Sequence, residues 1–250
     1  MIVGVDGCRG GWVAASRSAE DSASIEVFSS FAKLAGHFGE EAIIVVDMPI
    51  GLPPTAGLGG RGPEALLRPK LGQRQSSVFS IPSRSAVYAA DASFTSTETW
   101  YEAHRAASAV ARRTSDPPRG VSIQAFGIFA KIRELDEALR AQPALRQRVF
   151  ESHPEAAFWK LNGDKAMALP KKIKGRINPD GMTERRDLLR RCGASAEILD
   201  APPPRGAGED DALDAVAMML IAARIEAGLA VSFPDPPGAD DHGLPIAIWV

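Results

Sequence analysis

The stretches Ile2-Val3-Gly4-Val5-Asp6 and Ile43-Ile44-Val45-Val46-Asp47 decide the fold class of this chain. Both are short apolar runs rich in β-branched residues, and turn-forming residues follow each of them, which is typical of buried strands. If the two strands pair in parallel, Asp6 and Asp47 emerge side by side at one edge of the sheet, where ligands of open α/β sheets bind. Because adjacent carboxylates repel unless a proton or a divalent cation lies between them, the pattern predicts a metal site.

Length and composition predict one soluble domain over residues 1–250. Apolar residues make up 45% of the 250 residues and charged residues 24%, as in ordinary globular proteins. A net charge of −2 argues against a protein that coats nucleic acid with a uniformly basic surface. Two isolated cysteines predict neither a disulfide framework nor a zinc site. The start of the chain lacks a signal-peptide pattern, and no apolar run reaches the ~20 residues of a membrane span, so we expect a cytoplasmic protein without membrane contact.

The first fifth of the chain predicts a mixed sheet. A glycine-rich turn over 7–11 leads into a strand at 12–15, which indicates a hairpin, and 25–28 alternates as a third strand. A helix at 31–38 then leads to the fourth strand at 43–47. Three antiparallel strands, a helix and a strand that rejoins the first are typical of an α/β fold.

The remainder predicts an insertion followed by helices around one more strand. Residues 52–120 are rich in proline, glycine and arginine, and we interpret them as an insertion or lid after the fourth strand. Hydrophobic spacing and turn residues predict helices at 99–113, 122–140, 155–161, 183–191 and 210–227, and a short fifth strand at 148–151.

The last predicted helix carries a carboxylate in an apolar environment. Asp214 lies one turn inside a helix that is apolar nearly all round, so this carboxylate needs a partner, and a cation is the strongest. Asp211 shares its face, but acids in a first helical turn also serve as caps. Glu151 ends the fifth strand as Asp6 ends the first, and we prefer it as a ligand to Glu155, which the helix dipole explains.

Oxygen ligands without paired histidine or cysteine favour Mg²⁺ or Mn²⁺ over zinc. Two such ions activate a water and stabilise the leaving oxygen of a phosphodiester, so hydrolysis of that bond suits these acids. Nine lysines or arginines against three acids occupy 165–191. Among them, Lys171, Lys172 and Lys174 are candidates for holding the substrate backbone, although a solvated charge run explains them nearly as well. His153 is either a helix cap or a group that orients a water or phosphate.

Several stretches together resemble a known family. The order of strands, helices and acids is similar to the ribonuclease H-like superfamily, and more narrowly to its predicted nucleases, domain-of-unknown-function family 429. The stretches that carry this resemblance are 3–12, 47–53, 76–84, 124–126 with 131–132, 151–155 and 210–215.

The resemblance implies a mixed five-stranded sheet flanked by helices and a divalent-metal nuclease centre. It places ligands at Asp6, Asp47, Glu151 and either Asp211 or Asp214, and Arg9 and Arg84 lie in its matching stretches as candidate substrate contacts. Pro69 departs from the unbroken helix expected in the basic insertion.

We therefore expect a Mg²⁺- or Mn²⁺-dependent nuclease that binds nucleic acid. Two alternatives remain open, an ATP-using phosphotransferase of the actin-like or sugar-kinase type, and a non-catalytic nucleic-acid-binding module on the same fold. The sequence favours no oligomeric state, and no choice among DNA, RNA and a small nucleotide.

Overall fold

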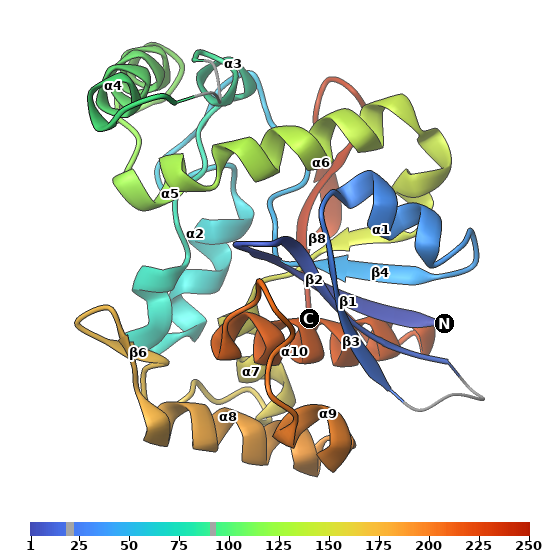
Figure 1. Cartoon of the computed structure of the whole chain (residues 1–250). Coiled ribbons are helices and arrows are strands. Elements are labelled where there is room, and N and C mark those ends of the chain that lie inside the picture. Colours follow the sequence, from blue (N-terminus) through green and yellow to red (C-terminus); the bar gives the residue numbers. More distant parts are fainter. Residues whose placement is uncertain (19–22, 91–93) are drawn as a thin grey trace.

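The computed structural model describes residues 1–18, 23–90 and 94–250, and its centre is a five-stranded mixed sheet (Figure 1). The strand order is β3-β2-β1-β4-β5, in which β1, β2 and β3 are antiparallel neighbours while β4 and β5 run parallel to β1. The strands are β1 (Ile2–Cys8), β2 (Gly11–Arg17), β3 (Ser24–Phe28), β4 (Ile43–Val46) and β5 (Val149–Glu151). The prediction of an α/β fold with a mixed five-stranded sheet is confirmed.

Helices and two small hairpins surround this sheet. The longer helices are α1 (Phe31–His37), α4 (Thr97–Arg113), α6 (Phe129–Ala141), α7 (Pro154–Leu161), α8 (Pro179–Arg191) and α10 (Glu209–Glu226). The shorter ones are α2 (Pro63–Leu67), α3 (Arg84–Val87), α5 (Ile123–Gly127) and α9 (Ala196–Asp200), with 3₁₀ turns η1 (Arg68–Lys70), η2 (Gly72–Ser77) and η3 (Pro143–Gln147). The hairpins are β6 (Lys172–Ile173) with β7 (Arg176–Ile177), and β8 (Ser232–Ala239) with β9 (Pro245–Trp249).

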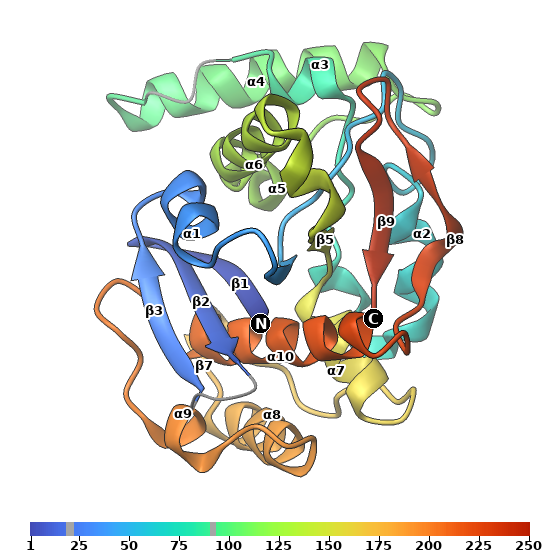
Figure 2. The ribbon, with the colours of Figure 1, turned by 90° about the vertical axis from the view of Figure 1, so that its right-hand side faces the viewer.

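Two hydrophobic cores lie on opposite faces of the sheet. Figure 2 shows α1 and α6 on one side of the sheet and α10 on the other. Alternate residues of a strand point to opposite faces. Val3 and Val5 of β1 therefore belong to the core beneath α1 and α6, while Ile2 belongs to the core shared with α10. By the same alternation Gly4 and Asp6 face α10, which brings the acid at the end of β1 to the side of the sheet that this helix covers.

Gly4 lets α10 approach β1 more closely than any side chain would allow. A Cβ atom at this position would lie 1.9 Å from the backbone nitrogen of Met219 and 2.1 Å from the carbonyl oxygen of Ala215. The strand and the helix therefore meet backbone to backbone, which is a close approach that only glycine permits.

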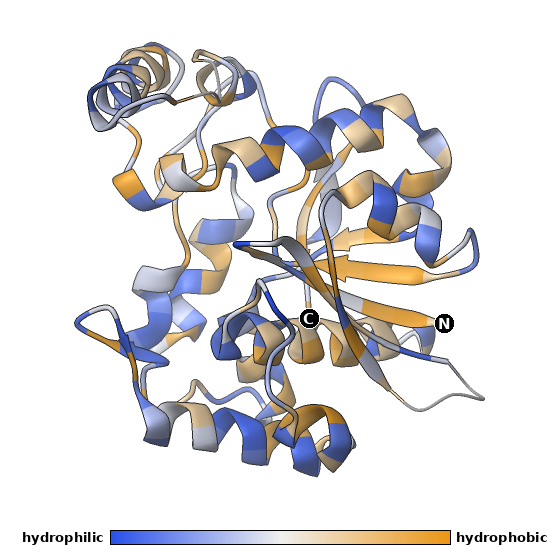
Figure 3. Cartoon of the chain, viewed as in Figure 1, coloured by the Kyte–Doolittle hydropathy of each residue, from blue (hydrophilic) through white to orange (hydrophobic). Residues whose placement is uncertain are grey.

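The helix α10 is buried on nearly all sides. Residues 212–222 all lie in the interior, and Figure 3 shows hydrophobic residues concentrated on β1, β4 and this helix. A helix that is apolar all round is a core element. Asp214, 3% exposed, is thus a carboxylate placed in the protein interior.

Three of the differences from the predicted elements have a local physical reason. The helix expected over 122–140 is divided at Ile128 into α5 and α6, after Gly127 ends α5. The helix expected at 183–191 begins earlier, at Pro179, because proline suits the first turn of a helix. The hairpin of β8 and β9 was not predicted, since the prolines of β8 argue against a strand and are tolerated only at a sheet edge.

The segment over 52–120 connects β4 to the elements before β5. Its helix α2 contacts the β8–β9 hairpin, and α3 contacts both α4 and α6 (Figure 1). Within the described ranges, every helix is too short or too polar to cross a membrane.

Candidate active site and metal centre

The parallel pairing of β1 and β4 sets the first two acids beside each other. Val5 lies opposite Val46, and the N–H of Asp47 donates to the carbonyl of Val5 at 2.8 Å, so Asp6 and Asp47 follow the same rung of the ladder. Asp214 approaches from the second turn of α10. Each of the three acids offers a carboxylate oxygen within 4.8 Å of those of the other two. The three form an acidic cluster that could hold a metal ion.

Burial and repulsion between like charges disfavour the ionised form of each carboxylate in this acidic cluster. Burial, followed by repulsion from Asp47 and Asp214, raises the pKa of Asp6 well above its usual value. Burial and the charge of Asp214 raise the pKa of Asp47 to about 8. Burial raises the pKa of Asp214 to about 6, although Lys171 opposes this rise. Ionisation of each of these acids is therefore unfavourable, and a bound cation would remove this penalty by pairing with the negative charge.

The hydrogen bonds of the acidic cluster leave oxygen atoms for a ligand. The N–H of Gly7 donates to Asp6 Oδ1 at 2.6 Å, and the ammonium of Lys171 forms an ion pair with Asp214 Oδ2. The other oxygen of Asp214 is buried and finds no hydrogen-bond partner among the described residues. A buried, unpaired carboxylate oxygen beside two further carboxylates matches the oxygen donor set that hard divalent cations take.

Glu151 lines the same cavity but lies outside the acidic cluster, and strand parity explains its position. It pairs with Val46 in the β4–β5 ladder, and paired residues share a face of the sheet. Val46 belongs to the core on the α6 side, so Glu151 points away from the face of Asp47. There its two oxygens accept hydrogen bonds from Arg61 and from the N–H of Ile50.

The acid Asp211 serves the start of α10. Its Oδ2 accepts a hydrogen bond from the N–H of Gly208 at 2.9 Å, which is a capping contact. Asp211 is not part of the acidic cluster found in the described part of the chain.

The predicted substrate-binding lysines separate in space. Only Lys171 lies in the cavity, where its pKa is raised because Asp214 outweighs the effect of burial. Lys172 forms an ion pair with Asp210 at 2.5 Å, and Lys174 is exposed at the turn between β6 and β7.

The two predicted arginines also lie apart from the acidic cluster. Arg9 is exposed in the turn between β1 and β2. Arg84 forms ion pairs of 2.5 Å with both Asp136 and Asp240, and it lines a separate cavity of about 380 Å³.

His153 acts as a helix cap, one of the two roles considered for it. Its Nδ1 accepts a hydrogen bond from the N–H of Glu155 at 3.2 Å, and Nε2 lies 3.3 Å from the carbonyl of Ser77. Burial lowers the pKa of His153 to about 4, so the ring is neutral at physiological pH. Glu155 forms a buried ion pair with Arg185 at 2.5 Å.

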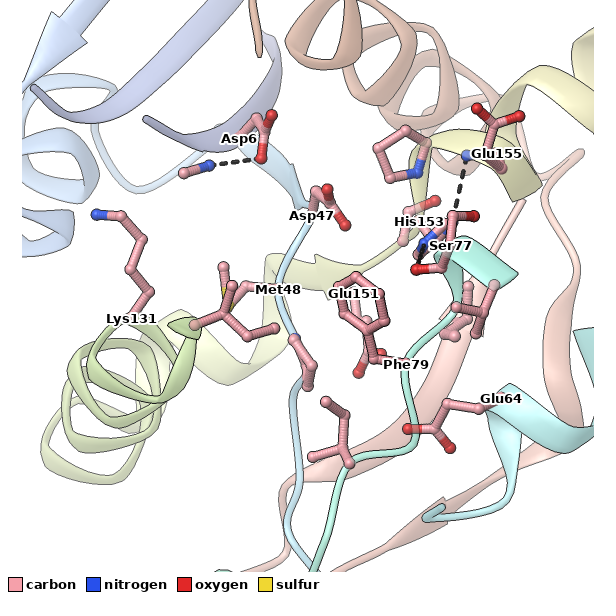
Figure 4. Close-up of a pocket in the computed structure, with 18 of the residues that line it drawn as sticks. Asp6, Asp47, Met48, Glu64, Ser77, Phe79, Lys131, Glu151, His153 and Glu155 are labelled. Carbon is pink, nitrogen blue, oxygen red and sulfur yellow. Dashed lines mark hydrogen bonds between the residues drawn. The ribbon is translucent and has the colours of Figure 1, made fainter. Parts of the chain in front are cut away.

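The cavity beside the acidic cluster has a volume of about 420 Å³ (Figure 4). Figure 4 shows Asp6, Asp47 and Glu151 at this cavity. Lys171 also lines it. Its apolar lining consists of Met48, Pro49, Val78, Phe79, Ile81, Ile128, Pro154 and Ile248. The volume falls within the range of small-molecule sites.

Lys131 is a candidate functional residue that motif reasoning did not single out. It extends from α6 into the cavity near Asp6 (Figure 4). Its ammonium lies 4.3 Å from the centre of the Trp12 ring. No carboxylate within the described residues forms an ion pair with it. Burial lowers its pKa. The nearest signal in the sequence is its place in the stretch 131–132, which does not reveal what the side chain faces.

Comparison with known proteins adds a family and no individual relative. A family model described as "Protein of unknown function (DUF429)" matches residues 4–239. No curated protein and no solved structure matches the chain.

Proposed function

The chain belongs to the DUF429 family, and we propose that it is a divalent-metal-dependent nuclease with a ribonuclease H-like fold that hydrolyses phosphodiester bonds. The carrying observation is the acidic cluster, in which Asp6, Asp47 and Asp214 come from two parallel strands and one buried helix. The strand order and the antiparallel first three strands agree with what a ribonuclease H-like fold would have.

The donor set supports Mg²⁺ or Mn²⁺ as the cofactor. All three candidate ligands are carboxylates, which hard cations prefer, and no histidine or cysteine belongs to the acidic cluster in the described ranges. A divalent cation bound there would activate a water for attack and stabilise the leaving oxygen.

The chain's own residues supply positioning and charge. The pairing of β1 with β4 fixes the backbone next to Asp6 and Asp47, so both carboxylates would reach a cation from adjacent strands. Lys171 balances the charge of Asp214. Lys131 presents a second ammonium to the cavity near Asp6, where a phosphate oxygen of the substrate would be attracted to it.

A cleavage screen tests this proposal. The purified protein is incubated with DNA, RNA, hybrid and branched substrates, with Mg²⁺ or Mn²⁺, beside Asp6→Asn and the control Asp187→Asn, an exposed acid on α8. We expect metal-dependent cleavage that Asp6→Asn abolishes and Asp187→Asn retains. Cleavage that survives in Asp6→Asn, or no cleavage of any substrate, would contradict the proposal.

A further inference from the structure

A second, more open groove of about 700 Å³ adjoins the cavity. Val78 and Phe79 line both hollows, so these two residues lie between the groove and the cavity that Asp6 and Asp47 line. Its other walls come from the segment after β4, from the chain just before α5 and from the first turn of α5.

The described residues that line the groove carry a net positive charge. Arg68 and Arg119 both line it, and no acid does so among the described residues. Burial lowers the pKa of Arg68, the charge of Glu64 outside the groove opposes this, and the charge of Arg119 adds a smaller lowering, so the two arginines are close enough to interact. Two guanidinium groups without an acid between them form an attractive position for a phosphate.

Arg68 is held in a fixed orientation. Its guanidinium donates to the carbonyls of Val78 and Gly59 and to the hydroxyl of Ser80, at 2.8 to 3.0 Å. Arg119, in contrast, is exposed, and its side chain makes no hydrogen bond within the described part of the protein. One arginine is therefore preorganised while the other is free to meet a ligand.

The remaining polar lining suits a strand of nucleic acid. Exposed amides and hydroxyls lie along the groove, from Gln75, Ser76, Ser80, Ser122 and Gln124. The ring of Phe79 is partly exposed at the junction with the cavity. Cationic grooves with an aromatic ring on which a base stacks are typical of single-strand binding.

We infer that this groove binds the phosphate backbone of a single-stranded nucleic acid and leads one nucleotide past Phe79 into the acidic cavity. The cavity of about 420 Å³ accommodates a group of nucleotide size and not a base-paired duplex. The inference rests on the proposed function, because it assigns the substrate of the same acids. Single-stranded DNA and RNA share the required chemistry.

Fluorescence anisotropy measures this binding without cleavage. Labelled single-stranded DNA and RNA of about 12 nucleotides, and the matched duplex, are titrated with the full-length protein in EDTA at several salt concentrations. The variants are Arg119→Ala, Arg119→Glu and Phe79→Leu, and the control is Arg191→Ala, an exposed arginine at the end of α8. Thermal unfolding checks that each variant is folded.

We expect single strands to bind more tightly than the duplex. Arg119→Glu should weaken single-strand binding about tenfold, and Arg119→Ala should reduce the salt slope by about 0.7. Phe79→Leu should weaken it about tenfold through the lost stacking, while Arg191→Ala leaves it unchanged. Preference for the duplex, no binding of single strands, or equal affinity in Arg119→Glu would overturn the inference.

The two proposals fail separately. A strand that binds as described but remains uncut with Mg²⁺ or Mn²⁺ would refute the nuclease and retain the groove. Metal-dependent cleavage that is unaffected by Arg119→Glu, together with unaffected binding, would refute the groove and retain the nuclease.

Discussion

Arg61 binds both carboxylate oxygens of Glu151, at 2.5 and 3.0 Å, and the two side chains are only 1% and 3% exposed. The same guanidinium donates to Glu64 at 2.8 Å. Burial raises the pKa of Glu151 to about 7 even though Arg61 opposes the rise. Arg61 thus joins the segment after β4 to the end of β5 by a buried ionic contact.

Removing Arg61 should destabilise the protein strongly. Arg61→Met leaves two buried carboxylates without their cation, and we expect a loss of about 3–5 kcal/mol in the free energy of unfolding. Glu151→Gln keeps one acceptor oxygen for Ile50 and Arg61, and Arg61 retains its pair with Glu64, so we expect a smaller loss of about 1–2 kcal/mol. Urea unfolding measures both, and equal losses would contradict this account.

The metal-free protein should lose stability as pH rises. The pKa of Asp47 is about 8 and that of Asp214 about 6, both above the ordinary 3.8, so the folded state holds more protons than the unfolded state between these values. The stability that these groups contribute is therefore greatest below about pH 4 and falls as the pH rises toward 8, by several kcal/mol. Unfolding in EDTA at pH 5 and pH 8 measures this fall.

Asp47→Asn should reduce that pH dependence, although Asp214 and Glu151 still contribute to it, and Asp187→Asn should leave it unchanged. A saturating divalent cation should also flatten it, because the cation stabilises the ionised carboxylates. An unchanged pH profile in Asp47→Asn would show that the acidic cluster does not cause the effect.

Metal binding should distinguish Asp214 from Asp211. Calorimetry with Mn²⁺ should show an affinity at least tenfold weaker in Asp214→Asn, because this acid belongs to the acidic cluster. Asp211→Asn should bind within about threefold of the natural protein, because its side chain caps α10. A weaker Mn²⁺ affinity in Asp211→Asn than in Asp214→Asn would instead indicate that the metal binds at the start of α10.

Lys131 should matter to catalysis and little to stability. Lys131→Met removes a cation–π contact worth about 0.5–1 kcal/mol and leaves the fold intact. It should lower kcat/KM on the substrate found in the cleavage screen by about 10- to 100-fold, and Lys131→Arg should restore part of this. Normal kcat/KM in Lys131→Met would exclude a contact between this ammonium and the substrate.

The sequence predicted the sheet and its first two acids because both depend on local pattern. The apolar runs 2–5 and 43–46, which lie in β1 and β4, are rich in β-branched residues, and an acid directly follows each run. Asp214 could also be predicted as a candidate ligand from the sequence, because a carboxylate inside an apolar helix needs a partner wherever that helix packs.

The position of Glu151 outside the acidic cluster could not be predicted from the sequence, because the face of the sheet on which it lies depends on the strand register. A shift of one residue moves a side chain to the other face of a sheet, and the sequence does not state which residue of β4 pairs with Glu151. The partners of Arg84 and the groove near Arg119 depend on contacts between distant segments, which local pattern does not contain.

The glycine at position 4 has a consequence for how tolerant the acidic cluster is of change. The main chains of β1 and α10 are in direct contact there. The distance between Asp6 and Asp214 is therefore set by this contact between the two backbones. Backbones do not repack as side chains do. Substitutions elsewhere in the core can therefore accumulate while the two acids keep their spacing. One added methyl group at Gly4 would instead push α10 away from β1 and change the distance between the two acids.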